Sequence, residues 1–343
     1  MASIFLVVLI SLSSQTYVVR VSAASANFLG IAGLPTDISQ ITRVISIMKA
    51  RGLNTFRMGC YASWLSDGET QYRSSFVRHF LDNTPSNYII IVDINHLYPA
   101  TEASAASARS HWTIVKNNIF KVLGDFRNNR RVAVELINEY VSNDFYSRMQ
   151  SLVNDIRSAG YTNMLVVNKF GQAWSVIKDT LKNTYQSYHY YFNSWSVSYA
   201  ISNAKLALSK GIRLLNTEVG ADYRESSYFT SSTVSELNSF LSQCASLGIG
   251  NLVWMNYNGD HSNNYPRYQS LNLRFPTVSS PLPLSSTQTK PHAPSSTTNQ
   301  SQNSTEPNNP DTWSTTADET FYLLDDDACQ ESMSAYINKI RVK

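Results

Sequence analysis

Two glutamates stand at the ends of apolar segments that are far apart in the chain. Glu139 ends the segment that begins at Val132, and Glu218 ends the segment that begins at Ile212. A pair of carboxyl groups suits glycoside hydrolysis, because one can protonate the leaving oxygen while the other, ionised, attacks the anomeric carbon. Different surroundings can divide these roles between two identical side chains. The two glutamates are therefore the candidate catalytic pair.

Other polar or aromatic residues stand at the ends of further apolar segments. They are Arg57, His96, Asn138, His189, Tyr191 and Trp254. Arg57 beside Glu218 would keep that carboxylate ionised. Each residue alone has an ordinary structural explanation, but their recurrence at successive segment ends indicates one functional rim. Glu135 lies further inside the segment that ends at Glu139, and we interpret it as structural.

The elements that must position these residues alternate between two patterns. Short apolar segments alternate with helical repeats, which is typical of a parallel α/β fold. Eight strands are predicted at 28–32, 53–58, 88–94, 132–137, 164–167, 185–191, 212–215 and 251–255. Seven helices are predicted near 38–48 and 72–81, in a stretch ending near 126, and at 142–159, 174–181, 197–209 and 233–247. Residues 258–276 are expected to form a loop with at most one turn.

Strict alternation over about 250 residues predicts a (β/α)8 TIM barrel, in which chemistry sits at the carboxyl ends of the strands. A doubly wound open sheet is the competing fold. No G-x-G-x-x-G follows the first strand and the chain has no P-loop, so a nucleotide site lacks support. Asp37 with Gln40, and Thr233 with Glu236, predict the caps that begin the first and last helices.

These segments resemble family 5 of the glycoside hydrolases, the cellulase family of clan A. VAVELINEY at 132–140 resembles the fourth-strand acid/base signature of that family. The family's strands two, three, six, seven and eight have counterparts in this chain, in the correct order. These segments are NTFRMG, VDINH, SYHYY, LLNTEVGA and LVWMNYNG. Tyr140 replaces the usual Pro, and Thr217 stands where Gly often precedes the nucleophile. Neither replacement is expected to touch the chemistry directly.

The resemblance implies a role for each rim residue. Glu139 would be the general acid and then base, and Glu218 the nucleophile of a retaining double displacement. Asn138 would bind the sugar 2-hydroxyl, and Arg57 and Tyr191 would hold Glu218. By the same resemblance, His96 and His189 would contact sugar hydroxyls and the acid/base region, while Trp254 would stack under the sugar.

The resulting expectation is a cellulase-like endo-β-glucanase acting on a polysaccharide or oligosaccharide. The alternatives are a β-mannanase, a β-1,3-glucanase, or a non-catalytic glycan-binding barrel that has kept the fold. The candidate sugar platforms, each also explicable as core, are Trp64, Trp112, Trp174 and Trp195. Two histidines are too few for a metal-dependent hydrolase, so no metal site and no cofactor are predicted.

The ends of the chain differ in composition from the body at 27–276. Residues 1–26 combine an apolar run with a small-residue cleavage site, which predicts a signal peptide, and Arg20 interrupts the run too early for a membrane span. Residues 277–316 are rich in Ser, Thr and Pro, which predicts a disordered linker, with sequons at Asn299 and Asn303. Residues 317–343 are a short segment of unknown role. A secreted, extracellular glycoprotein is therefore expected.

Composition sets further limits. The chain is 43% hydrophobic and 15% charged, so wholesale disorder is excluded. A net charge of +3 is too weak for a dedicated nucleic-acid surface, and a monomer is expected. Cys60, Cys244 and Cys329 lack the spacing of a structural zinc site. They allow one disulfide and one free thiol, and the pairing stays open.

Overall fold

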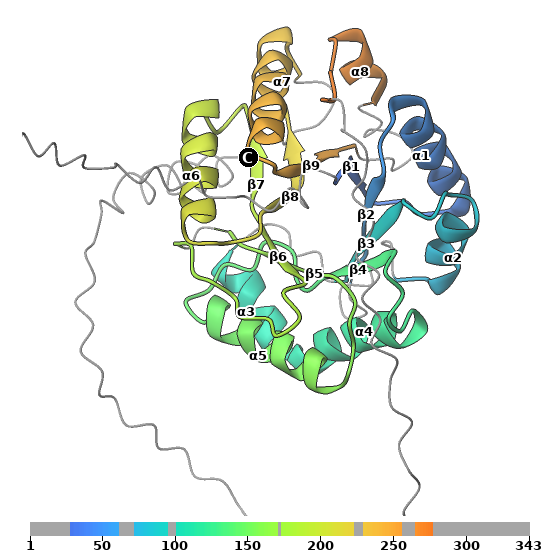
Figure 1. The fold of residues 1–343 in the computed structure, drawn as a ribbon, viewed down its shortest axis with the longest axis vertical. Helices are drawn as coiled ribbons and strands as arrows, with labels where there is room; N and C mark the ends of the chain where they lie inside the picture. The colour runs from blue at the N-terminus through green and yellow to red at the C-terminus, as the bar shows by residue number, and fades with distance from the viewer. Residues whose placement is uncertain are drawn as a thin grey trace, which may run out of the picture. The chain divides into compact units, whose positions relative to one another are not determined.

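Parallel strands curl into a barrel at the centre of the structure (Figure 1). The computed structural model describes residues 28–61, 72–94, 101–170, 173–222, 229–255 and 265–276. The strands in these ranges are β1 (Leu29–Gly33), β2 (Thr55–Gly59), β3 (Ile89–Asp93), β4 (Val132–Glu135), β5 (Leu165–Asn168), β6 (Thr184–Ser187), β7 (His189–Tyr191), β8 (Leu215–Gly220) and β9 (Gly250–Trp254). They lie in the order β6-β5-β4-β3-β2-β1-β9-β8-β7. A bridge joins Gln186 of β6 to Leu214, the residue before β8, so the sheet is nearly closed.

The strand predicted at 185–191 is split in two at Tyr188. Its first part, β6, pairs with β5, whereas its second part, β7, pairs with β8. The split therefore lies where the two edges of the sheet meet. With β6 and β7 taken as one strand, the described residues contain the eight strands of a (β/α)8 TIM barrel, and the predicted fold is confirmed.

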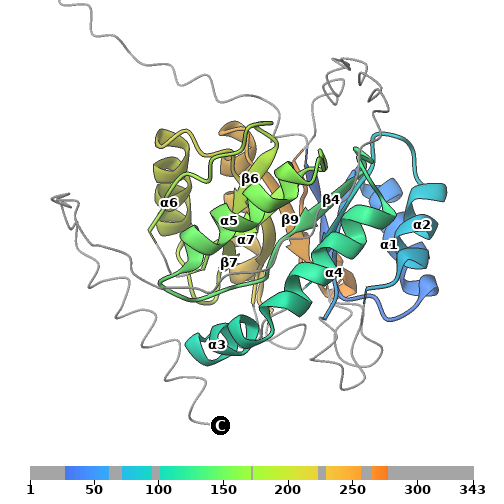
Figure 2. The same cartoon turned by 90° about the horizontal axis from the view of Figure 1, so that it is seen from below.

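Helices cover the outside of the barrel in both views (Figures 1 and 2). They are α1 (Ile38–Arg51), α2 (Ser74–Asp82), α3 (Glu102–Ser110), α4 (Trp112–Asp125), α5 (Phe145–Ser158), α6 (Val197–Ser209), α7 (Ser231–Ser246) and α8 (Tyr265–Ser270). The Asp37 side chain caps α1 by accepting from the Gln40 backbone N–H at 3.0 Å, as predicted. Gly52 ends α1 in the left-handed conformation, which glycine adopts without a steric penalty.

Alternate residues of each strand face two different apolar layers. In β3, Ile89 and Ile91 join the cluster that fills the barrel, while Ile90 and Val92 join the cluster beneath the helices. A strand buried on both faces needs such a continuous apolar run. In β2, Phe56 and Met58 face the helices. Because side chains alternate along a strand, Arg57 between them faces the interior of the barrel.

The helix predicted at 174–181 is wrong, since residues 173–183 contain no helix. The backbone of this segment is bound by side chains and does not form the repeating hydrogen bonds of a helix. Asp179 accepts from the backbone N–H groups of Leu181 and Asn183, at 3.0 and 2.9 Å. Gln150 of α5 accepts from the Lys178 N–H at 2.7 Å and donates to the carbonyl of the same residue at 2.8 Å. Local side-chain hydrogen bonds of this kind compete with helix formation.

The seventh and fourth predicted strands end elsewhere in the structure. β8 spans Leu215–Gly220 rather than 212–215, so Glu218 lies within the strand. Three consecutive polar residues, Asn216, Thr217 and Glu218, interrupt the apolar pattern from which this strand would be predicted. In the structure, Asn216 bonds across the sheet to Asn251 at 2.9 Å. β4 is shorter than predicted and ends at Glu135, which leaves Glu139 four residues beyond it.

Three helix predictions are corrected at their boundaries. The stretch ending near 126 contains two helices, α3 and α4, which His111 separates. α7 is capped by a reciprocal pair of hydrogen bonds between Thr230 and Thr233, one turn before the predicted cap. α8 is longer than the single turn expected after β9. The ring of its Tyr268 packs against Phe229, and the Tyr268 hydroxyl oxygen accepts from the Ala221 N–H at 3.0 Å.

Cys60 and Cys244 are buried free thiols, so these two do not form a disulfide. Cys329, the predicted signal peptide and the segments 277–316 and 317–343 lie outside the described residues. Within the described ranges, no helix has both the length and the apolar character that crossing a membrane requires.

Candidate active site

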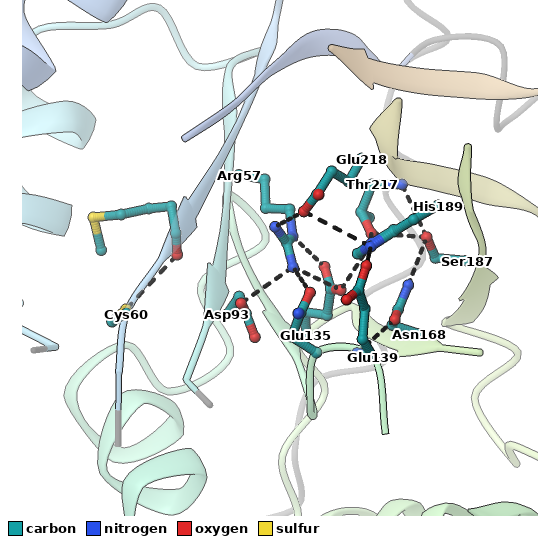
Figure 3. Close-up of polar contacts among 12 residues, drawn as sticks. Arg57, Cys60, Asp93, Glu135, Glu139, Asn168, Ser187, His189, Thr217 and Glu218 are labelled. Atoms are coloured by element: carbon teal, nitrogen blue, oxygen red, sulfur yellow. Dashed lines mark hydrogen bonds and ion pairs between the residues drawn. The ribbon is translucent and has the colours of Figure 1, made fainter. Parts of the chain in front are cut away.

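Arg57 lies at the centre of a buried cluster of acidic groups (Figure 3). Its guanidinium donates to both oxygens of Glu135, at 2.8 and 3.1 Å, and to Glu218 Oε2 at 2.9 Å. It also donates to Asp93 Oδ2 at 3.1 Å and to Asn138 Oδ1 at 2.6 Å. Strands β2, β3, β4 and β8 supply four of these residues, so the barrel brings together groups up to 161 positions apart.

Both burial and the neighbouring charges shift the pKa values of the groups in this cluster. Burial alone would lower the pKa of Arg57, but the charges of Glu135, Asp93 and Glu218 raise it overall, so the guanidinium stays charged. Burial raises the pKa of the Glu135 carboxyl and the charge of Asp93 raises it further, while Arg57 opposes both effects. Breaking a buried ion pair of this kind typically destabilises a protein by about 3–5 kcal/mol.

Tyr191 of β7 holds the second oxygen of Glu218. Its hydroxyl donates to Glu218 Oε1. Burial raises the pKa of Tyr191, as does the charge of Glu218, so the phenol keeps its proton and remains a donor. Both oxygens of Glu218 are thus held by hydrogen-bond donors, which fix the orientation of its carboxyl group.

Glu139 has an unusual backbone conformation. Its φ is 46°, in the left-handed region, where a residue with a Cβ is strained by roughly 1–2 kcal/mol. The Glu139 N–H donates to Asn168 Oδ1 at 2.8 Å, and Glu139 Oε1 lies 2.7 Å from His189 Nδ1. The side chain is 12% exposed, whereas that of His189 is almost fully buried. Surrounding groups therefore stabilise a backbone that is locally unfavourable.

The two candidate catalytic carboxylates face each other across the barrel mouth. One oxygen of Glu139, one oxygen of Glu218 and a ring nitrogen of His189 all lie within 4.8 Å of one another. Retaining glycosidases hold their carboxyl groups about 5–5.5 Å apart, and inverting ones about 6.5–9.5 Å apart. The spacing of these oxygens is closer to the retaining separation, which suits direct attack by one carboxylate, than to the inverting one.

The same three residues could offer ligands to a metal ion. Arg57 and Tyr191 already occupy both oxygens of Glu218, and His189 lies at hydrogen-bond distance from Glu139. A cation would have to displace these partners. The donor set therefore fits acid–base and nucleophilic chemistry better than a metal centre.

The remaining residues predicted from the sequence fall into two groups. Asn138 joins the Arg57 cluster, and Trp254 at the end of β9 belongs to the cluster inside the barrel, against which Tyr191 packs. Both side chains therefore lie on the inner side of the barrel wall, as the candidate catalytic residues do. His96 lies outside the described residues, as does Trp64.

Three candidate sugar platforms belong to the packing under the helices. Trp174 is buried in that outer core, and Trp112 and Trp195 pack against it half-buried. None of these three belongs to the cluster inside the barrel. The structure therefore supports a place in the core for these three tryptophans, which was the alternative to a role as sugar platforms.

Sequence reasoning missed several polar residues at the site. Glu135, interpreted from the sequence as structural, binds the Arg57 guanidinium through both of its oxygens. Thr217 was expected not to touch the chemistry, yet its hydroxyl contacts His189 Nε2 at 3.5 Å. The other missed residues are Asp93, Asn168 and Ser187, which are fully buried polar groups on β3, β5 and β6. A polar residue at the end of an otherwise apolar strand was the available signal for Asp93 and Asn168.

A (β/α)8 barrel with two facing glutamates at its mouth suits the hydrolysis of glycosidic bonds. The family described as Cellulase (glycosyl hydrolase family 5) matches residues 21–260. The chain belongs to this family and is a glycoside hydrolase.

Solved structures share the fold at low sequence identity. The catalytic domain of a mannanase from Streptomyces sp. SirexAA-E has a TM-score of 0.53 and 17% identity, over 69% of this chain and 78% of that chain. A β-mannanase from Streptomyces thermolilacinus, solved with mannohexaose, has a TM-score of 0.52 and 17% identity over 69% and 81%. A protein described as cellulase Cel5C_n has a TM-score of 0.54 and 13% identity over 72% and 83%. No curated protein matches the sequence significantly.

Proposed function

We propose that this chain is a retaining, endo-acting hydrolase of β-linked glucan, with Glu218 as nucleophile and Glu139 as general acid and then base. The observation that carries the proposal is the spacing of the two carboxylates, whose oxygens lie within 4.8 Å. The different partners of the two groups support the division of roles. Glu218 faces a cation and a phenol, whereas Glu139 faces a histidine.

Double displacement proceeds in two steps at this pair. In the first, Glu218 attacks the anomeric carbon while Glu139 protonates the glycosidic oxygen, and the leaving sugar departs. In the second, Glu139 takes a proton from water, which attacks the same carbon and releases Glu218. Asn138 is oriented by Arg57 to bind the 2-hydroxyl, and Trp254 forms the floor beneath the sugar.

β-Mannan is the second candidate substrate, because two similar structures are named as mannanases. β-1,3-Glucan remains a third. Incubation with soluble β-1,4-glucan, β-1,3-glucan and β-mannan, with product analysis and NMR of the first anomer released, tests both substrate and stereochemistry. Initial release of the β-anomer is expected. Release of the α-anomer would contradict the retaining mechanism, and cleavage of none of these glycans would favour a non-catalytic glycan-binding protein.

Gly220 is expected to be essential for the contact between Tyr191 and Glu218. A Cβ at residue 220 would lie 2.6 and 2.8 Å from two carbons of the Tyr191 ring, which must then move. In Gly220→Ala, kcat on glucan should fall by about 10-fold, since a displaced partner misaligns the nucleophile. Steady-state kinetics of Gly220→Ala, Tyr191→Phe and the double variant check this. Losses that add in full would show that Gly220 acts independently of Tyr191.

We also propose that the protein is secreted after removal of residues 1–26 and glycosylated at Asn299 and Asn303. The apolar N-terminal run and the position of both sequons in a Ser/Thr-rich segment support this. Expression in a glycosylating secretory host tests the proposal. Mass spectrometry of the medium should find an N-terminus near Asn27 and glycans at the two asparagines, and retention in the cells would contradict it.

Truncation after Pro276 should leave hydrolysis of soluble substrate unchanged. A Ser/Thr-rich segment cannot bury enough apolar surface to form a core, whereas Tyr268 and Leu273 are buried and must be kept. Thermal unfolding and activity are measured for two truncated chains, one that ends at Pro276 and one that ends at Asn264. The shorter chain should be less stable, and a loss of folding in the longer one would show that residues 277–343 support the barrel.

A further inference from the structure

A closed ring of polar contacts surrounds Glu139 (Figure 3). From the Glu139 N–H it runs to Asn168 Oδ1 at 2.8 Å, and from Asn168 Nδ2 to Ser187 Oγ at 3.4 Å. Ser187 Oγ lies 2.7 Å from the Thr217 hydroxyl and accepts from the Thr217 N–H at 2.9 Å. Thr217 contacts His189 Nε2 at 3.5 Å, and His189 Nδ1 returns to Glu139 Oε1 at 2.7 Å.

The ring holds Glu139 at two separate points. Asn168 binds its backbone, and His189 binds its carboxyl group. Control of the backbone matters because Glu139 lies four residues beyond β4 with a φ of 46°, so the strand itself does not define its conformation. An acceptor placed at the N–H favours this otherwise strained conformation and aims the side chain at the barrel mouth.

Four strands supply the rest of the ring. Asn168 ends β5, Ser187 ends β6, His189 begins β7 and Thr217 lies on β8. All four side chains are buried, which makes their hydrogen bonds difficult to exchange for water. Ser187 of β6 and Thr217 of β8 contact each other where the two edges of the sheet meet, beside the split between β6 and β7. The ring thus connects the acid/base to the rigid wall of the barrel.

We infer that Asn168, Ser187 and Thr217 are positioning residues for Glu139, holding its backbone through Asn168 and its carboxyl group through His189. They act on proton transfer to and from the glycosidic oxygen, whereas Arg57 and Tyr191 hold the nucleophile Glu218. The inference rests on the proposed function, because it assigns Glu139 the role of acid and base.

The dependence of the rate on the leaving group separates this role from a merely structural one. The value of kcat/KM reports the glycosylation step, in which a poor leaving group needs the acid and a dinitrophenolate does not. Each variant is therefore assayed on the cleaved polysaccharide and on the dinitrophenyl β-cellobioside or β-mannobioside that the wild type accepts. The variants are Asn168→Ala and Thr217→Val, with Thr217→Ser as the conservative replacement that keeps the hydroxyl.

Asn216→Ala is the matched control. Asn216 precedes Thr217 on β8 but bonds to Asn251 on β9, so the substitution disturbs the same strand without entering the ring. It should lower the melting temperature and leave the ratio of kcat/KM for the two substrates at its wild-type value.

Asn168→Ala is expected to lower kcat/KM on the polysaccharide by about 10- to 100-fold and on the dinitrophenyl glycoside by less than about threefold. Thr217→Val should change the ratio in the same direction, and Thr217→Ser should restore it. Equal losses on both substrates, or a Thr217→Ser variant no better than Thr217→Val, would overturn the inference alone. If Asn168→Ala does not fold, the two Thr217 variants decide. A wild type that cleaves none of the glycans overturns the proposed function and this inference with it.

Discussion

Glu218→Gln is expected to abolish turnover on every glycan and aryl glycoside, with a loss on the order of 10⁶-fold, as when other enzymes lose their nucleophile. An amide cannot form the glycosyl–enzyme ester, whatever the leaving group. The change keeps the size of the side chain, and the single oxygen of the amide can still accept from one of its two partners, Arg57 or Tyr191. Initial rates on polysaccharide and on dinitrophenyl glycoside measure the loss.

Circular dichroism and thermal unfolding serve as the control for folding of this variant. Glu218→Ala with added azide gives a second readout, because azide can enter the space of the missing carboxylate. The expected product is the α-glycosyl azide, formed by a single displacement. A variant that folded and retained more than about a hundredth of the wild-type rate on both substrates would show that another group is the nucleophile.

Glu139→Gln is expected to separate the two classes of substrate. Loss of the general acid should lower kcat/KM on polysaccharide by about 10²- to 10⁴-fold. Dinitrophenyl glycosides should be nearly spared in kcat/KM, because their leaving group departs without a proton. Their kcat should fall, since the second step then lacks a base, and azide should restore it by attacking the glycosyl–enzyme without one.

The product of azide rescue distinguishes the two glutamates. With Glu139 replaced, azide reacts after the ester has formed, so the product should be the β-glycosyl azide. An equal loss of kcat/KM on activated and unactivated substrates would contradict the role of Glu139 as acid. An α-azide would mean that the two assignments must be exchanged.

The sequence alone determined the barrel, and it predicted which residues form its rim. Periodicity predicts strands well where a strand is buried on both faces, as β3 is, because its apolar run is then continuous. It failed at 174–181, where the side chains of Asp179 and Gln150 bind the backbone that a helix would have used. It also ended β8 too early, since the polar residues of that strand have partners that are distant in the sequence, such as Asn251 for Asn216.

The rim residues could be identified because polar side chains at the ends of apolar strands are conspicuous. Their partners were not, because a hydrogen bond between residues 78 or 161 positions apart, such as those of Arg57 with Glu135 and Glu218, leaves no local pattern. The same holds for Asn168, whose contact with the Glu139 N–H requires a left-handed backbone that the residue type itself disfavours. Residue types and their order thus determined which groups could do chemistry. Closure of the barrel decided how they are held, because only there do buried polar groups from separate strands satisfy one another.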